Sequence, residues 1–155
     1  MRKITRREVR EFLLQALYSR SAYGVDFSLP AFQDSYYEPF TLPVLEDPYF
    51  MDAFEGIVRE EPVLLAVIAK LAPKFDPKIM PPVNLLPLCI GAYEMLYLKT
   101  ESVPEKVSIN EAVELAKKFS DDGARELING VLNKLKDEKS TILDTITPVE
   151  RVLFL

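Results

Sequence analysis

The sequence predicts a single all-α domain, and three observations support this fold class. Apolar residues recur three and four positions apart over most of the chain, which is the spacing of one helical face. No stretch shows the strict alternation of apolar and polar residues that is typical of a strand. The length of 155 residues suits one domain with its own hydrophobic core. We therefore expect six or seven helices in one domain over residues 1–155, with a basic arm at 1–5 and a tail at 140–155.

The first helix is expected over residues 5–22. Thr5 is a residue type that caps helix starts, and Gly24 is one that ends helices. The buried stripe of this helix is Val9, Phe12, Leu13, Ala16 and Leu17. Residues 25–46 are rich in proline and aromatic residues without a sustained period, so we expect a loop there with room for one short helix.

Prolines divide the middle of the chain in this interpretation. One helix is predicted over residues 48–60, and Pro62 is placed in the first turn of the next, which ends at residue 72. A connection with several prolines follows at 73–82. Residues 83–98 are apolar on nearly every side, as is typical of a central helix. Its regular part is expected to begin near Pro87, because proline is tolerated best at a helix start.

The stretch from 103 to 135 is predicted to form two amphipathic helices joined by a tight polar turn at residues 120–122. Ser108 and Glu111 have the spacing of a capping box at the start of the first helix. Gly130 lies inside the second helix, where glycine costs about 1 kcal/mol against alanine, so we expect another backbone to approach it closely. The two apolar stripes are Ile109, Ala112, Val113 and Ala116, then Ala124, Leu127, Ile128, Val131, Leu132 and Leu135.

The composition excludes several classes of site. The sequence has no histidine, which removes histidine general bases, Ser/His/Asp triads and His-containing zinc sites. The single cysteine, Cys89, allows no internal disulfide and is expected to be an inert buried thiol in a reducing cytoplasm. Residues 83–98, the longest apolar stretch, are too few to span a membrane comfortably. We expect a cytoplasmic protein that is not an enzyme and has no metal, cofactor or membrane association.

The charge is distributed unevenly along the chain. The net charge is −5, which argues against indiscriminate nucleic-acid binding. Residues 1–20 nevertheless carry six Lys/Arg against two acids, whereas residues 21–61 carry one Arg against nine acids. This asymmetry predicts a basic end for an anionic partner and an acidic flank that faces elsewhere.

Two motifs resemble the NusB family of bacterial transcription antitermination factors. INEAVELAKKF followed by NGVLNKL, within residues 109–135, is similar to the C-terminal half of the family. RREVREFLLQALYS, at residues 6–19, is similar to its N-terminal arginine-rich helix. The resemblance implies two packed three-helix bundles. It also implies binding of boxA-like single-stranded RNA together with NusE, a small-subunit ribosomal protein, within an antitermination complex on RNA polymerase that serves ribosomal RNA transcription.

The basic residues of the N-terminal region are the first candidates for RNA contact: Arg2, Lys3, Arg6, Arg7 and Arg10. The guanidinium group binds phosphate in a forked geometry and stacks on unpaired bases. A solvated basic helix face is the alternative interpretation.

Further candidates come from the two motifs. Gln15 and Tyr18 follow on the same helix, and Tyr18 is suited either to stacking on a base or to half-buried packing. The resemblance also places Lys117, Lys118 and Asn129 near the RNA. Their alternative roles are interaction with the helix dipole for the lysines, and hydrogen bonding between helices for Asn129.

The sequence departs from the family pattern at two places. Leu85 and Cys89 stand where relatives usually carry cations, and Leu127 stands where they often carry phenylalanine. These changes support a second hypothesis, a NusB-like protein-interaction module with weak or lost RNA binding. A third hypothesis is an accessory domain of a ribosomal RNA methyltransferase. The length of the chain leaves no room for the catalytic domain of a complete enzyme of that kind. Oligomeric state, the exact RNA sequence, the role of the 25–46 loop and the docking of the terminal VLFL stay open.

Overall fold

The computed structural model describes residues 2–36 and 43–155 and confirms the all-α prediction, since these residues contain helices and no strand ladder. Residues 37–42 of the expected loop lie outside the described residues. Short 3₁₀ turns occur at Gly24–Asp26, Val44–Glu46 and Ile142–Asp144. The helices of the described ranges are α1 (Arg6–Tyr23), α2 (Leu29–Ser35), α3 (Pro48–Leu71), α4 (Pro82–Leu96), α5 (Glu105–Phe119) and α6 (Asp122–Glu138).

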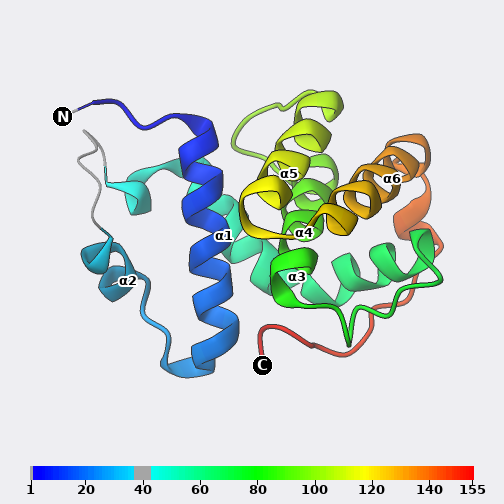
Figure 1. The fold of residues 1–155 in the computed structure, drawn as a ribbon, viewed down its shortest axis with the longest axis horizontal. Helices are drawn as coiled ribbons and strands as arrows, with labels where there is room; N and C mark the ends of the chain where they lie inside the picture. The colour runs from blue at the N-terminus through cyan, green and yellow to red at the C-terminus, as the bar shows by residue number, and fades with distance from the viewer. Residues whose placement is uncertain (1, 37–42) are drawn as a thin grey trace.

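Helix α4 is the centre of the fold. It packs against α3, α5, α6 and α1, and its residues from Leu85 to Met95 are buried on all sides, as the continuous apolar run predicts. In Figure 1, α1 and α2 lie on one side of the molecule, α4, α5 and α6 on the other, and α3 extends behind both groups. Helix α2 is held on α1 by aromatic contacts, with the Phe12 and Phe32 ring centroids 5.1 Å apart.

The predicted ends of α1 are confirmed. The hydroxyl of Thr5 accepts a hydrogen bond from the backbone N–H of Glu8, whose carboxylate accepts one from the backbone N–H of Thr5. Gly24 ends the helix with φ 64°, a conformation that favours glycine. The cap fixes where α1 begins, and so where its arginines project.

The predicted breaks at two prolines are wrong, because α3 continues through Pro62 and α4 begins at Pro82 and contains Pro87. A proline inside a helix cannot donate to the carbonyl four residues earlier. Distant side chains supply the missing donors. The Arg151 guanidinium donates to the Val58 carbonyl at 2.6 Å, and the Ser120 hydroxyl donates to the Val83 carbonyl at 2.5 Å.

The predicted Ser108–Glu111 capping box is also wrong. The N-cap of α5 is Pro104, four residues before Ser108, and the helix begins at Glu105. Ser108 is buried and donates to Glu94 at 2.8 Å, while Glu111 pairs with α1. The start of α6 is as predicted in residues 120–122, with Asp121 as the N-cap.

The predicted close approach at Gly130 is not found, since a Cβ there would meet no atom within 4 Å. Gly130 lies on the exposed side of α6. The crowded glycines are Gly56, where a Cβ would lie 1.9 Å from the Tyr93 hydroxyl oxygen, and Gly91, where it would lie 2.6 Å from Leu132. Close packing of α3 and α6 on α4 therefore depends on these two positions.

Candidate nucleic-acid interface

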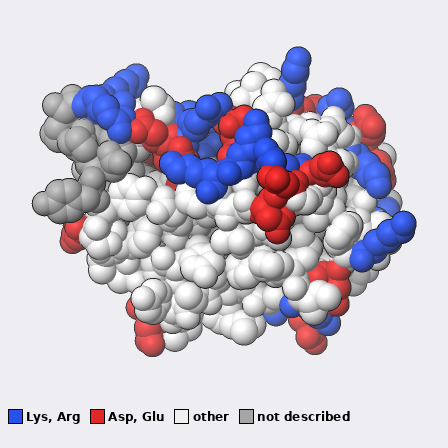
Figure 2. Space-filling model, in the orientation of Figure 1, with Lys and Arg blue, Asp and Glu red and all other residues white. Residues whose placement is uncertain are grey.

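Basic side chains gather over the start of α1 and the end of α5. Figure 2 shows them along the upper part of this face, with acidic side chains between and beside them, while the lower part is mostly uncharged. The first of them, Arg2, pairs with Glu8 at 2.7 Å, and Lys3 is exposed beside it. The hydrogen bond from Arg2, with those from Thr5, lowers the pKa of Glu8 to about 2. The arm is thus attached to the cap of α1.

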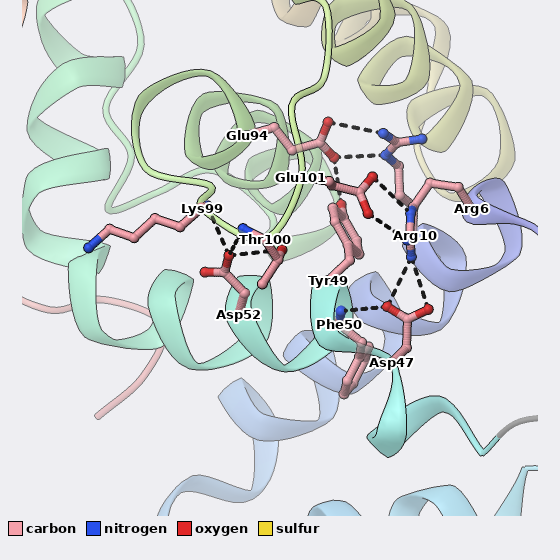
Figure 3. Close-up of polar contacts among 10 residues, drawn as sticks. All are labelled: Arg6, Arg10, Asp47, Tyr49, Phe50, Asp52, Glu94, Lys99, Thr100 and Glu101. Carbon is pink, nitrogen blue, oxygen red and sulfur yellow. Dashed lines mark hydrogen bonds and ion pairs between the residues drawn. The ribbon is translucent and has the colours of Figure 1, made fainter.

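Arg6 is held between two carboxylates from different parts of the chain. Its Nη1 donates to Asp47 Oδ1 at 3.0 Å, and its Nη2 donates to Glu101 Oε1 at 2.6 Å. The guanidinium carbon also lies 4.3 Å from the centroid of the Tyr49 ring. Figure 3 shows Arg6 reaching from α1 to both acids. The N–H groups of its guanidinium therefore already donate to acids of the same chain.

Asp52 of α3 explains why Glu101 faces Arg6. Its carboxylate accepts from the backbone N–H groups of Lys99 and Thr100, at 3.0 and 3.1 Å, and from the Tyr93 hydroxyl at 2.7 Å. These bonds fasten the loop between α4 and α5 to α3, as Figure 3 shows. Burial raises the pKa of Asp52, but the hydrogen bonds outweigh burial and the net pKa is lowered.

Arg10 lies in the core, one turn after Arg6. Its side chain is 4% exposed and that of its partner Glu94 is 1% exposed, with Nε 2.7 Å from Oε2. The Tyr49 hydroxyl and Ser108 hydroxyl donate to the same carboxylate at 2.5 and 2.8 Å. Burial lowers the pKa of Arg10, but the hydrogen bonds and attraction of Glu94 outweigh it and the net pKa is raised. Figure 3 shows this network joining α1, α3 and α4, and Ser108 adds α5. We therefore assign Arg10 a structural role.

A groove between α1 and α5 brings four of the predicted residues together. Arg7, Lys117 and Lys118 line it, with Arg10 at its inner side. Their side chains are 58%, 49% and 61% exposed. The remaining lining residues are Glu11, Glu111, Glu114 and Leu115. We call this feature the basic groove.

The carboxylates of the basic groove pair with its cations. Arg7 Nε lies 3.1 Å from Glu111 Oε2, and Lys117 Nζ lies 3.1 Å from Glu114 Oε1. Lys118 pairs with Glu11 across the two helices. The hydrogen bond to Glu111 raises the pKa of Arg7. Exposed pairs of this kind contribute about 0–1 kcal/mol each, so an anion that enters the groove exchanges one carboxylate for another acceptor at little cost.

The other predicted residues lie apart from the groove. The Gln15 amide donates to the Tyr36 hydroxyl at 2.8 Å, which ties α1 to the end of α2. Tyr18 is 45% exposed on the next turn of α1. Asn129 is on the exposed side of α6, where its carbonyl oxygen accepts from the Asn133 amide at 2.8 Å. Tyr18 and Asn129 therefore retain surface that a ligand can reach.

The departures from the family pattern are packed into the protein. Leu85 and Cys89 are fully buried in α4, and burial raises the pKa of the Cys89 thiol, as expected of an inert cysteine. Leu127 is half-buried and lines an apolar hollow beside the α3–α4 connection, together with the exposed Phe75 and Ile79. The apolar residues on α4 thus suit their surroundings.

Sequence reasoning missed the acids of the basic groove. Glu11 lies four residues after Arg7, and Glu114 three before Lys117, so their helical spacing places each on the same side as a cation. Glu111 gave no such signal, because its partner is 104 residues away. In residues 2–36 and 43–155, no helix is long and apolar enough to cross a membrane, and no acid or cysteine cluster suits a metal ion.

Comparisons with known proteins give the family and the fold. The sequence matches the NusB family over residues 7–137. It is 37% identical over 134 residues to the transcription antitermination protein NusB of Thiobacillus denitrificans, covering 86% of this chain and 89% of that protein. The Bacillus subtilis protein of the same name is 34% identical, with 86% and 95% covered. The fold resembles a solved structure of T. maritima NusB, with TM-score 0.75, 23% identity, and 90% and 96% of the two chains covered.

Proposed function

Because this chain belongs to the NusB family of transcription antitermination factors, which are not enzymes, we propose that it binds boxA-like single-stranded RNA together with a NusE-type ribosomal protein. In this proposal the pair joins an antitermination complex on RNA polymerase and supports transcription of ribosomal RNA in the cytoplasm. Similarity to relatives over most of the chain supports the family role, and the basic groove supports the RNA contact.

The observation that carries the RNA proposal is the exposed basic groove between α1 and α5. Arg7, Lys117 and Lys118 converge there from two helices that are far apart in sequence. Three cations that line one groove suit the closely spaced phosphates of a single strand, and arginine adds a planar fork. Tyr18, on the exposed side of α1, is the candidate for stacking on a base.

Contacts within the chain reduce the set of candidate RNA ligands. Arg10 is committed to Glu94 in the core, and Arg6 is committed to Asp47 and Glu101. The proposed phosphate contacts are therefore Arg7, Lys117 and Lys118, with Lys3 on the adjacent arm. The exposed acids of segment 21–61, among them Asp26, Asp34, Glu46 and Glu55, supply charge complementary to a basic ribosomal protein.

The second candidate function is a protein-interaction module without RNA selectivity. The pairing of the groove cations with Glu11, Glu111 and Glu114 favours it, because these acids repel an entering phosphate. The two functions differ in one measurable property, the selective binding of RNA.

The test is binding of a boxA-like RNA and a scrambled RNA of equal length at two salt concentrations, with and without the NusE-type protein. The triple variant Arg7→Ala, Lys117→Ala, Lys118→Ala should bind more weakly, and its slope of log affinity against log salt should be shallower by about 2. The matched control replaces Lys74, Lys136 and Lys139, which are exposed outside the groove and carry the same charge.

Each result decides between the candidates. Preference for the boxA-like RNA that increases with the partner and is lost only in the groove variant supports the proposal. Partner binding without any RNA preference favours the interaction module. Equal losses in the groove variant and its control refute the groove as the RNA site.

A further inference from the structure

The last seven residues form an ordered strap on the surface of α3. The strap, residues 149–155, comes after the region matched by the family and follows α3 toward the far end of α1 (Figure 1). Leu153 and Phe154 are buried in the core, so the terminal VLFL is docked. The strap carries no helix, and its backbone N–H groups are therefore available to a partner.

That partner is the carboxylate of Glu61, a fully buried acid in the middle of α3. Oε2 accepts from the backbone N–H groups of Val152 and Leu153 at 3.0 and 2.5 Å, and Oε1 accepts from that of Phe154 at 3.3 Å. Arg151 Nη1 lies 3.5 Å from Oε1. A buried carboxylate without partners is strongly unfavourable, so four donors from one segment make Glu61 tolerable only when that segment is present.

The next residue, Pro62, provides further acceptors. Because proline lacks an N–H, the Val58 carbonyl is left without its helical donor. Arg151 Nη1 donates to this carbonyl at 2.6 Å instead. The Pro62 carbonyl accepts from the Val149 N–H at 3.0 Å. A buried acid and a helix-interior proline are each costly alone. Here they are adjacent, and the same short segment satisfies both.

The strap also reaches α1. The Arg20 guanidinium lies 6.0 Å from the centroid of the Phe154 ring, and its Nη1 is 3.5 Å from the Leu155 carbonyl oxygen. Phe154 itself is buried in the core. The strap therefore connects the middle of α3 to the last turn of α1.

We propose that α3 around Glu61 and Pro62 is a recognition site for an extended peptide of the pattern Arg-apolar-Leu-Phe, and that the strap of the same chain is its resident ligand. The carboxylate recognises three consecutive backbone N–H groups, the Val58 carbonyl recognises the arginine, and the core receives the leucine and phenylalanine. This site is separate from the basic groove and does not depend on RNA binding.

Hydrogen exchange in the full-length protein tests the contact with Glu61. The amides of residues 152–154 should be protected in the wild type, and Glu61→Gln should speed their exchange at least about tenfold, because a neutral amide is a weaker acceptor for three donors. The matched control is Glu60→Gln, the neighbouring acid, which pairs with Arg59 at the surface. Fast exchange in the wild type, or equal effects of both variants, overturns the proposal.

A labelled peptide, PVERVLFL, tests recognition in trans and does not require Glu61→Gln to be stable by itself. Full-length protein with Arg151→Ser, Leu153→Ser and Phe154→Ser should bind it saturably, because its own strap no longer fills the site. Wild type should bind at least about tenfold more weakly through competition with its strap. Adding Glu61→Gln to the serine variant should abolish binding. Absence of binding to the serine variant, or binding unaffected by Glu61→Gln, overturns the site.

Discussion

Replacing Arg10 with methionine separates its structural role from RNA binding. Methionine keeps much of the volume but removes the cation, and leaves the Glu94 carboxylate in the core. Breaking a buried pair in this way costs about 3–5 kcal/mol. The hydroxyls of Tyr49 and Ser108 still donate to Glu94, so we expect the lower end, about 3 kcal/mol. In a domain of this size, that lowers Tm by about 6–12 °C.

The assay is urea unfolding followed by circular dichroism at neutral pH. Arg10→Met should lower the midpoint at an unchanged m-value, the signature of altered stability. Arg7→Met, one turn earlier on the same helix, is the control: its exposed pair with Glu111 contributes about 0–1 kcal/mol. A second variant, Arg10→Met with Glu94→Gln, should recover part of the loss, since no uncompensated charge is left in the core and the amide oxygen can still accept from the Tyr49 and Ser108 hydroxyls.

The reasoning is refuted if Arg10→Met lowers the free energy of unfolding by less than about 1 kcal/mol. That result would mean that the buried charge of Glu94 does not depend on Arg10. The two variants should have the opposite order of effects on RNA affinity. Arg7→Met should weaken it without changing stability. Arg10→Met should leave it unchanged under conditions where the variant is folded.

Three further predictions follow from the contacts above. Glu111→Gln should strengthen RNA binding several-fold in a filter or fluorescence assay, since it removes the acid that pairs with Arg7; weaker binding would contradict the groove. Gly130→Ala should raise the free energy of unfolding by up to about 1 kcal/mol, while Gly56→Ala should lower it by about 1–3 kcal/mol through collision with Tyr93. Glu8 has a folded pKa of about 2, so the stability that it contributes is present above pH ~4.5 and is lost as the pH falls toward 2. In Glu8→Gln, the free energy of unfolding should therefore change less with pH across this range, which urea unfolding at several pH values measures.

Local signals predicted the helices well where the cause was local. Thr5 and Asp121 accept from the N–H groups at their helix starts, and Gly24 takes the positive φ expected after a helix. The prolines failed because the compensation was distant: Arg151 and Ser120 supply donors from other segments. A proline inside an apolar periodic stretch therefore does not by itself predict a helix end, because a donor from a distant segment can replace the missing N–H.

The candidate site was predictable only in part for the same reason. The sequence located the arginines but not their partners, which lie 41 to 104 residues away for the contacts of Arg6, Arg10 and Arg7. Arg6, Arg7 and Arg10 are alike by composition, and helical phase alone does not show which one faces a buried acid. In the sequence, Glu94 is a lone acid within an apolar helix, and only the fold shows that Arg10 of α1 is its partner.

The seam between α1 and α5 differs from the other contacts of α1 in a way that suits anion binding. Helix α1 is held to α3 and α4 by its apolar stripe and by the buried Arg10–Glu94 pair, whereas toward α5 it presents Arg7 and Glu11 to Glu111 and Lys118. A phosphate that enters this seam exchanges one ionic partner for another and uncovers no apolar surface. Because core contacts hold the α1 backbone in place, we expect it to keep its position when an anion binds. Binding at the basic groove should therefore depend steeply on salt and little on conformational change, the opposite of a site that must open first.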